Sequence, residues 1–297
     1  MMDSADGFGY KIFTDATADF SADMLRRYPL VEIIPMEVTV GGENFQYGGK
    51  GGNLTVKRFY AMQREGKFAS TSQINPVTYY DYFEPVLKEG FDILYLCFSS
   101  TLSNCFNNAR MCMDALWQKY PERKMFCVDT LTASVGESLL VGEAAKKQLE
   151  GWCIEELAAW SDQTKLKVCN WFMVDNFDHL KYGGRVSSIT AMAGGLLNIK
   201  PLLHMNAKGE LVVVQKCRGR RKAVSEKIKQ MKEGWLPEIS PSVIVGHGDD
   251  EEAAMMLKDA VIENFPKAEV TVAQIGPVIG AHTGPGMLAL IYFGGNR

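Results

Sequence analysis

The sequence has no long hydrophobic run, which argues against a protein built around membrane-spanning helices. Its longest apolar stretches have the length of a strand, well short of the ~18 residues that a spanning helix needs. The first residues, MMDSADGFGYK, have neither the basic nor the apolar region of a signal peptide. We therefore expect a cytoplasmic protein with only peripheral or transient membrane contact.

Signatures of metal and nucleotide binding are also absent. The four histidines are scattered and the seven cysteines form no C-x-x-C pair, so neither a metal site nor a disulfide framework is predicted. There is no phosphate loop, no H-E-x-x-H, no G-x-S-x-G elbow and no G-x-G-x-x-G that opens a helix. We expect no cofactor, and we expect that the chain does not bind ATP by itself.

The charge balance argues against nucleic-acid binding. The net charge is −3, with 23% charged residues, whereas nucleic-acid-binding domains are usually basic. One basic cluster stands out, at Arg218, Arg220, Arg221 and Lys222. It is either a solvated face or a site for a phosphate or an acidic partner.

Two α/β domains are predicted, with a boundary near residue 165. A chain of 297 residues, 46% of them hydrophobic, can form two cores at about 100–200 residues per domain. Strand and helix patterns alternate in residues 1–165, which predicts a three-layer α/β/α domain with a parallel sheet. In residues 166–297 the alternation gives way to paired strands, including a hairpin around 206–209, which predicts a mixed-sheet α/β domain.

Residues 91–113 (FDILYLCFSSTLSNCFNNARMCM) form the centre of the predicted first domain. The apolar run 93–98 predicts a strand buried on both faces, and a helical pattern begins at 109. Ser99 and Ser100 lie in the polar loop between them. Ligands of α/β domains bind beyond the carboxyl ends of the strands, so these serines are candidates for binding an anion or a carbonyl. The alternative is that Ser99 or Ser103 caps the helix.

Further polar residues are predicted at strand ends of the same sheet. The loop Thr71-Ser72-Gln73 precedes a predicted helix at 77–87, and Asp15 and Asp129 each follow a predicted strand. Since parallel strands end at the same edge of a sheet, these residues join the serine loop as candidates for a ligand site.

The second domain contributes two candidates, His282 and Arg185. His282 lies in GAHTGPG, within a Gly-rich loop predicted for 276–286; the glycines and proline fix the backbone there, so a site and a structural role are both open. Arg185 follows two glycines in a turn predicted at 180–185, and it either faces an anion or forms a surface ion pair. A small-residue helix is predicted over 187–197.

The sequence resembles the DegV family, through motifs distributed over nearly the whole chain. The order and spacing of the motifs make the resemblance specific, although each is weak alone. It implies a protein that holds a long-chain fatty acid in a buried tunnel. It also implies the acyl-binding subunit of a bacterial fatty acid kinase, which presents the carboxylate to a separate ATP-binding subunit for acyl phosphate formation. The motifs are FTDATADF (13–20), TSQINP (71–76), SSTLSNCFNNA (99–109), KYGGRVS (181–187), KPLLHMNAKGEL (200–211), KCRGRRKA (216–223) and IGPVIGAHTGPGMLAL (275–290).

The resemblance also implies which residues bind the head group. Thr71 and the pair Ser99 and Ser100 would hold the fatty acid carboxylate, with His282 nearby. The sequence departs from the usual family pattern at 103–106, where SNCF replaces SGTY. Such departures leave the length and saturation of the acyl chain open.

Arg185 and Arg218 match family arginines associated with phosphoryl transfer or kinase docking. Two other functions stay open from the residues alone. One is a stand-alone acyl hydrolase or transferase, with Ser100 as nucleophile, His282 as base and Asp15 or Asp129 as orienting acid. The other is a lipid carrier without a kinase partner.

Overall fold

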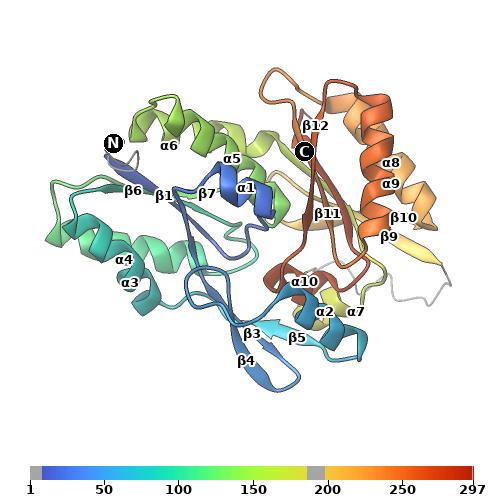
Figure 1. The fold of residues 1–297 in the computed structure, drawn as a ribbon, viewed down its shortest axis with the longest axis horizontal. Helices are drawn as coiled ribbons and strands as arrows, with labels where there is room; N and C mark the ends of the chain where they lie inside the picture. The colour runs from blue at the N-terminus through green and yellow to red at the C-terminus, as the bar shows by residue number, and fades with distance from the viewer. Residues whose placement is uncertain (1–8, 186–197, 296) are drawn as a thin grey trace.

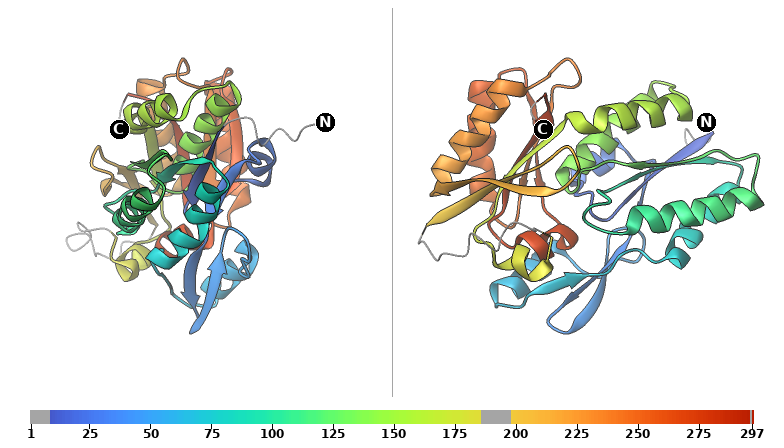
Figure 2. Two further views of the ribbon diagram at one scale, coloured as in Figure 1. Left: turned by 90° about the vertical axis from the view of Figure 1, so that its left-hand side faces the viewer. Right: turned by 180° about the vertical axis from the view of Figure 1, so that it is seen from behind.

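The computed structural model describes residues 9–185, 198–295 and 297, and it contains three β-sheets (Figure 1). A four-stranded and a six-stranded sheet lie side by side, and a smaller three-stranded sheet projects from one end. Figure 2 shows the same arrangement from the side and from behind. The α/β class is confirmed, with one parallel and one mixed sheet.

The four-stranded sheet is parallel throughout, with the order β2-β1-β6-β7. Alternate residues face opposite sides: Ile12 and Leu94 belong to one hydrophobic core, and Phe13 and Ile93 to another. Both faces are therefore covered by helices, as expected for continuous apolar strands. The strands are β1 (Tyr10–Asp15), β2 (Val31–Ile34), β6 (Asp92–Cys97) and β7 (Met125–Asp129); α1 (Ala22–Arg27), α5 (Val135–Leu149) and α6 (Ile154–Thr164) contribute to the first core, and α3 (Pro76–Lys88) and α4 (Cys105–Lys119) to the second.

The six-stranded sheet has the order β10-β9-β8-β13-β11-β12, and only β11 and β12 pair in parallel. Helices α8 (Arg220–Gly234) and α9 (Glu251–Asn264) cover one face. Helix α5 packs on the other face, against β8, β11 and β13, so it separates the two large sheets. The strands are β8 (Val168–Met173), β9 (Ile199–Met205), β10 (Leu211–Arg218), β11 (Ser242–His247), β12 (Glu269–Gln274) and β13 (Leu288–Phe293).

The third sheet is antiparallel and has three strands. Its order is β4-β3-β5, formed by β3 (Met36–Val40), β4 (Glu43–Tyr47) and β5 (Ala69–Thr71), with α2 (Val56–Arg64) beside it. Helix α10 (Pro277–Thr283) packs against β3, β5 and α2, and also contacts α7 (Asp178–Gly183). Elements from the predicted second domain thus complete a unit that begins in the first.

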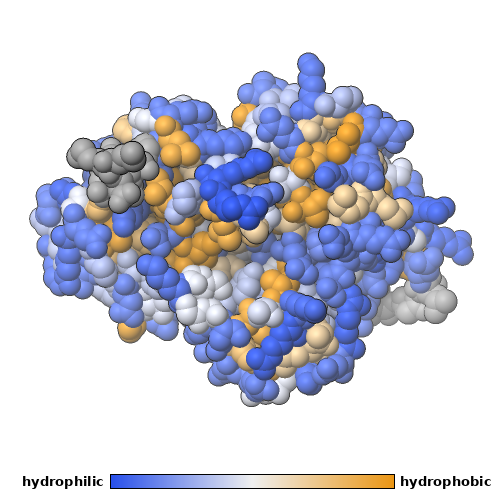
Figure 3. Space-filling model, in the orientation of Figure 1, coloured by the Kyte–Doolittle hydropathy of each residue, from blue (hydrophilic) through white to orange (hydrophobic). Residues whose placement is uncertain are grey.

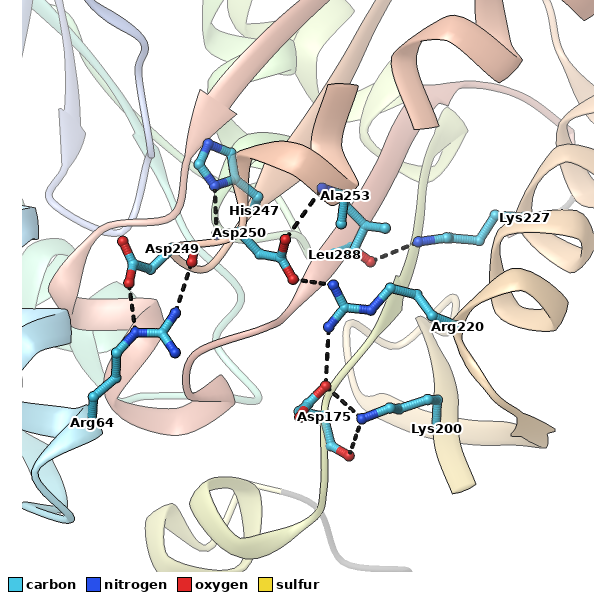
Figure 4. Close-up of polar contacts among 10 residues, drawn as sticks. All are labelled: Arg64, Asp175, Lys200, Arg220, Lys227, His247, Asp249, Asp250, Ala253 and Leu288. Carbon is cyan, nitrogen blue, oxygen red and sulfur yellow. Dashed lines mark hydrogen bonds and ion pairs between the residues drawn. The ribbon is translucent and has the colours of Figure 1, made fainter. Parts of the chain in front are cut away.

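Ion pairs connect α2 to the six-stranded sheet (Figure 4). The Nε and Nη2 atoms of Arg64 donate to Oδ2 and to the carbonyl oxygen of Asp249, both at 2.8 Å. Further along the same edge, the Arg220 guanidinium lies between Asp175 and Asp250, and Lys200 donates to Asp175 at 2.6 Å. The Arg64 contact therefore ties α2, beside the small sheet, to the segment that follows β11.

Two segments predicted as irregular are helical. Residues 276–286 were expected to form a loop and 180–185 a turn, but they contain the whole of α10 and the end of α7. One reason is that several of their Gly and Pro residues lie at helix ends: Pro277 occupies the first turn of α10, and Gly284 ends it with a φ of 73°. The helix predicted at 187–197 lies outside the described residues.

The predicted serine cap of α4 is wrong for Ser99. Asn104 occupies the N-cap position without a side-chain hydrogen bond. The Ser103 hydroxyl does accept a hydrogen bond from the Cys105 N–H at 3.3 Å, so Ser103 supports the start of the helix. The Ser99 hydroxyl makes a different contact, described below.

The face of the molecule seen in Figure 3 is mainly polar. Figure 3 shows hydrophilic side chains over most of one face, with small groups of hydrophobic ones, some of them between the two large sheets. In the described part of the chain, we find no helix long and apolar enough to cross a membrane.

Candidate functional site

A cavity of about 230 Å³ lies where the three sheets approach one another. Its wall includes Met36 of β3, Phe98 just after β6, Phe172 of β8 and Ala289 of β13. The chain leaves β1 towards β2 and leaves β6 towards β7, on opposite sides. The cavity therefore lies beyond the carboxyl ends of a parallel sheet at its topological switch point, the usual ligand position in such folds.

Apolar side chains form most of the cavity wall, and several are flexible. Met205 and Leu211 come from the β9–β10 hairpin, while Val278 and Ile279 come from α10. Methionine adapts its shape to irregular apolar ligands. Such a wall suits a hydrocarbon chain better than a polar metabolite.

Polar residues gather on the side where the cavity meets the surface. An outer recess shares Leu102, Ser103, Asn104, Arg185 and Leu211 with the cavity, so the two spaces are contiguous. The cavity wall also includes Gln73, Thr71 and His282. This side is the natural place for the charged end of an otherwise apolar ligand.

Thr71 and His282, two predicted site residues, are in direct contact. Thr71 ends β5 and His282 lies in the last turn of α10, 211 residues apart, yet Oγ1 and Nε2 are 2.9 Å apart. This contact exists because α10 packs on the three-stranded sheet. Either atom donates, depending on the tautomer of the imidazole.

The His282 imidazole is neutral at physiological pH. Burial, with smaller contributions from the nearby Arg185 and His179, lowers its pKa to about 4. Its Nδ1 has no hydrogen-bond partner among the described residues. A Cβ atom at Gly183 would lie 2.2 Å from this nitrogen, so only glycine fits there. That close approach explains the first glycine of the KYGGR motif.

Arg185 lies at the mouth of the cavity, as part of its wall. Its Nη1 donates to the carbonyl oxygen of Gly183 at 2.5 Å, and its Nε donates to that of Leu102 at 3.4 Å. These neutral acceptors orient the guanidinium and leave its charge uncompensated by a carboxylate in the described contacts. The arrangement suits an anion at the mouth.

The Ser99 hydroxyl contacts the other half of the molecule. It donates to the carbonyl oxygen of Gly209 at 2.8 Å, and Thr101 donates to the same oxygen. A Cβ atom at Gly209 would lie 2.3 Å from the Ser99 Oγ. Ser99 therefore holds the tip of the β9–β10 hairpin, which supplies Met205 and Leu211 to the cavity wall.

Ser100 lines the outer recess and does not line the cavity. Its N–H donates to Asp129 Oδ1 at 3.1 Å. In the described contacts neither serine is hydrogen-bonded to His282, whose Nε2 partner is Thr71. The nucleophile–base pair that a serine hydrolase needs is therefore not assembled here.

Arg218 is exposed at the far end of β10, paired with Ile199 in the register of the sheet. Leu211, which lines the cavity, begins the same strand. Seven residues of strand separate their Cα atoms by roughly 23 Å at 3.3 Å per residue. The structure thus brings Thr71, His282 and Arg185 together, but not Arg218.

Three buried carboxyl groups beneath the cavity include two residues that sequence reasoning missed. Asp15 is the last residue of β1, Asp19 follows that strand, and Glu137 lies in the first turn of α5; all three are almost completely buried. Only Asp15 was singled out, because a glutamate in a helix gives no sign of burial. They do not amount to a metal site, since no group of three or more possible ligands is found among the described residues.

One proton is shared within this cluster. The Thr17 hydroxyl lies 2.6 Å from Asp15 Oδ1 and also contacts Glu137 Oε2, but it has one proton to donate. Burial raises the pKa of Asp15, but the hydrogen bonds that it accepts from Thr17, Phe98 and Tyr95 oppose this effect and favour its charged form over that of Glu137. Burial and the charge of Asp15 raise the pKa of Glu137, so Glu137 carries the proton. Burial likewise raises the pKa of Asp19 to about 7.

Comparison with known proteins identifies the family. The family described as "Uncharacterised protein, DegV family" matches residues 10–294. The chain belongs to the DegV family. A DegV domain-containing protein of Clostridium perfringens is 36% identical and covers 97% of this chain and 98% of its own length.

Solved DegV structures share the whole fold. A fatty acid-binding DegV family protein from Thermus thermophilus is 28% identical, with a TM-score of 0.83 over 96% of this chain and 99% of its own. A stearic acid-binding protein from Eubacterium ventriosum is 25% identical, with a TM-score of 0.84 over 95% and 97%. Both of these proteins of similar fold bind fatty acids.

Proposed function

We propose that the protein binds a long-chain fatty acid, with its hydrocarbon tail in the cavity and its carboxylate beside Thr71 and His282. The observation that carries this proposal is the contact between these two residues at the polar end of an apolar cavity. The fatty acid ligands of the Thermus and Eubacterium relatives support it.

The energetics agree with this orientation. Each buried methylene contributes about 0.8 kcal/mol, so a fifteen-carbon tail contributes on the order of 10 kcal/mol before the costs of binding. The carboxylate must be met by donors, because its desolvation costs several kcal/mol. Thr71, Gln73, Asn104 and Arg185 all line the cavity, and their side chains have a hydroxyl, two amides and a guanidinium as possible donors. At neutral pH the uncharged His282 can also donate one N–H.

Protein purified without detergent should carry a long-chain fatty acid, because the apolar cavity favours occupancy over water. Organic extraction followed by mass spectrometry would identify the ligand. Delipidated protein should then take up palmitate or oleate in a titration. An extract without fatty acid, together with no uptake of either acid, would contradict the proposal.

We further propose that the bound carboxylate is presented to a separate ATP-binding kinase subunit, which forms an acyl phosphate. The resemblance to fatty acid kinase subunits supports this step, as does the position of Arg185 at the mouth. A lipid carrier without a kinase partner would bind the same ligand. Acyl phosphate formation with an added kinase subunit would separate the two functions.

Arg218→Ala should leave fatty acid affinity unchanged and abolish acyl phosphate formation with the kinase subunit. The affinity should not change because Arg218 is exposed and lies at a strand end remote from the cavity. The matched control is Lys216→Ala, which removes one positive charge from an exposed residue two positions earlier on the same strand. An equal loss of acyl phosphate formation in both variants would indicate a general charge effect. Weaker fatty acid binding in Arg218→Ala would indicate that the arginine supports the structure of the pocket.

A further inference from the structure

Helix α10, which carries His282, is held in place by close contacts with neighbouring elements. It is only seven residues long and packs on α2 and the three-stranded sheet. Two buried side chains of α2 bind carbonyl groups in and just before this helix: Gln63 donates to the Gly280 oxygen and Tyr60 to the Ile275 oxygen, both at 3.0 Å. A Cβ atom at Gly280 would lie 2.7 Å from Phe59, so the helix is also in close contact with α2.

The first N–H of this helix is bound by a residue from the opposite end of the chain. Gly276 occupies the N-cap position and has no side chain with which to cap the helix. Its N–H donates to Asp19 Oδ1 at 2.7 Å, across 257 residues of sequence. A Cβ atom at Gly276 would lie 2.6 Å from that oxygen and 2.5 Å from the Tyr47 hydroxyl. Asp19 therefore sets the position of α10 along its own axis.

The second oxygen of Asp19 fixes another wall of the cavity. The Ser134 hydroxyl donates to Asp19 Oδ2 at 2.6 Å. Ser134 lines the cavity, precedes α5 and has a φ of 59°, a conformation that is strained for a residue with a side chain. One buried carboxyl group thus holds the starts of both α5 and α10.

We propose that Asp19 is the positioning residue of the head-group site: through Gly276 it places α10 so that His282 meets Thr71. His282 lies six residues beyond Gly276, about 9 Å along the helix at 1.5 Å per residue. An axial shift of α10 therefore moves His282 by a similar amount, because a short helix moves as a unit. The proposal rests on the proposed function, and it adds a residue that contacts no ligand itself.

The test compares the affinity for a fatty acid with that for its methyl ester. Delipidated wild-type protein is titrated with palmitate and with methyl palmitate, and the ratio of the two affinities measures recognition of the carboxylate. Asp19→Ala should lower this ratio about tenfold, mainly through weaker palmitate binding. Asp19→Asn, which retains an oxygen to accept from Gly276, should restore most of it. Asp23→Ala, at an exposed position on α1, is the control and should keep the wild-type ratio.

Gly276→Ala tests the same contact from the helix side. Its φ of −77° is open to alanine, so the substitution changes only the close approach to Asp19 and Tyr47. The ratio should fall as in Asp19→Ala, and this variant decides the matter if Asp19→Ala does not fold. Equal weakening for acid and ester, or an unchanged ratio in folded Gly276→Ala, would overturn the inference. A wild-type protein that does not prefer the acid would instead overturn the proposed function.

Discussion

Thr71→Val should weaken fatty acid binding about ten- to hundred-fold. Valine keeps the shape and the strand preference of threonine but removes the hydroxyl that lies 2.9 Å from His282. Loss of a neutral donor to a buried charged acceptor costs about 1.5–3 kcal/mol, and 1.4 kcal/mol corresponds to a tenfold change in affinity. Isothermal titration of delipidated protein with palmitate would measure the effect.

Two matched variants sharpen this prediction. Thr39→Val removes a hydroxyl on the neighbouring strand, where it donates to Asn44 at 2.8 Å outside the cavity, and should bind like the wild type. Ser100→Ala should also bind nearly normally, because Ser100 lines only the outer recess. If Thr71→Val binds palmitate with wild-type affinity, the carboxylate does not lie beside Thr71. If Ser100→Ala loses much of its affinity, the carboxylate lies further out, in the outer recess.

Lys227→Met should stabilise the protein at pH 7 by a few kcal/mol. Lys227 is completely buried in α8, and its Nζ donates to the carbonyl oxygen of Leu288 at 2.8 Å (Figure 4). Burial, with a smaller effect of Arg220, lowers its pKa from 10.5 to about 7. The unfolded chain therefore binds a proton more tightly than the folded one, and this difference disfavours folding by about 4–5 kcal/mol at or below pH 7. Methionine removes that cost, while the lost hydrogen bond offsets about 1 kcal/mol.

The stability gain from Lys227→Met should depend on pH. Since the folded pKa is lower than the unfolded one, the cost of Lys227 is complete below pH 7 and disappears as the pH rises towards 10.5. The gain from Lys227→Met should therefore shrink between pH 7 and 10, as measured by urea unfolding at several pH values. Lys229→Met, at an exposed position of the same helix, should show no such trend. A variant less stable than the wild type at pH 7 would show that the amine contributes more through its contacts than its burial costs.

The strands of the large sheets could be predicted because burial leaves a direct pattern. Residues 93–98 are apolar on both faces, and the structure gives β6 there with both faces covered. The helix α10 could not be recognised, because seven residues bounded by Gly and Pro show the composition of a loop. The helix depends on packing against α2 and the three-stranded sheet, and no local sequence pattern predicts such packing.

In the candidate site, too, some residues could be predicted from the sequence and others could not. Thr71, His282 and Arg185 were found through motifs, and they lie at one end of one cavity. The motifs could not show where the Ser99 hydroxyl points, because its acceptor, Gly209, comes from a hairpin over a hundred residues later. Asp19 was hidden for a similar reason, since its two partners are distant in sequence.

The place of β13 in the six-stranded sheet has a consequence for synthesis of the protein. This strand is the last one described along the chain, yet it lies between β8 and β11. A growing polypeptide folds from its N-terminal side first, so the sheet stays divided until residues 288–293 leave the ribosome. Helix α10 and the cavity residues of β13 arrive at the same late stage. Until then the apolar surfaces of α5 and β8 lack their cover, and a nascent chain has no closed cavity in which to hold a ligand.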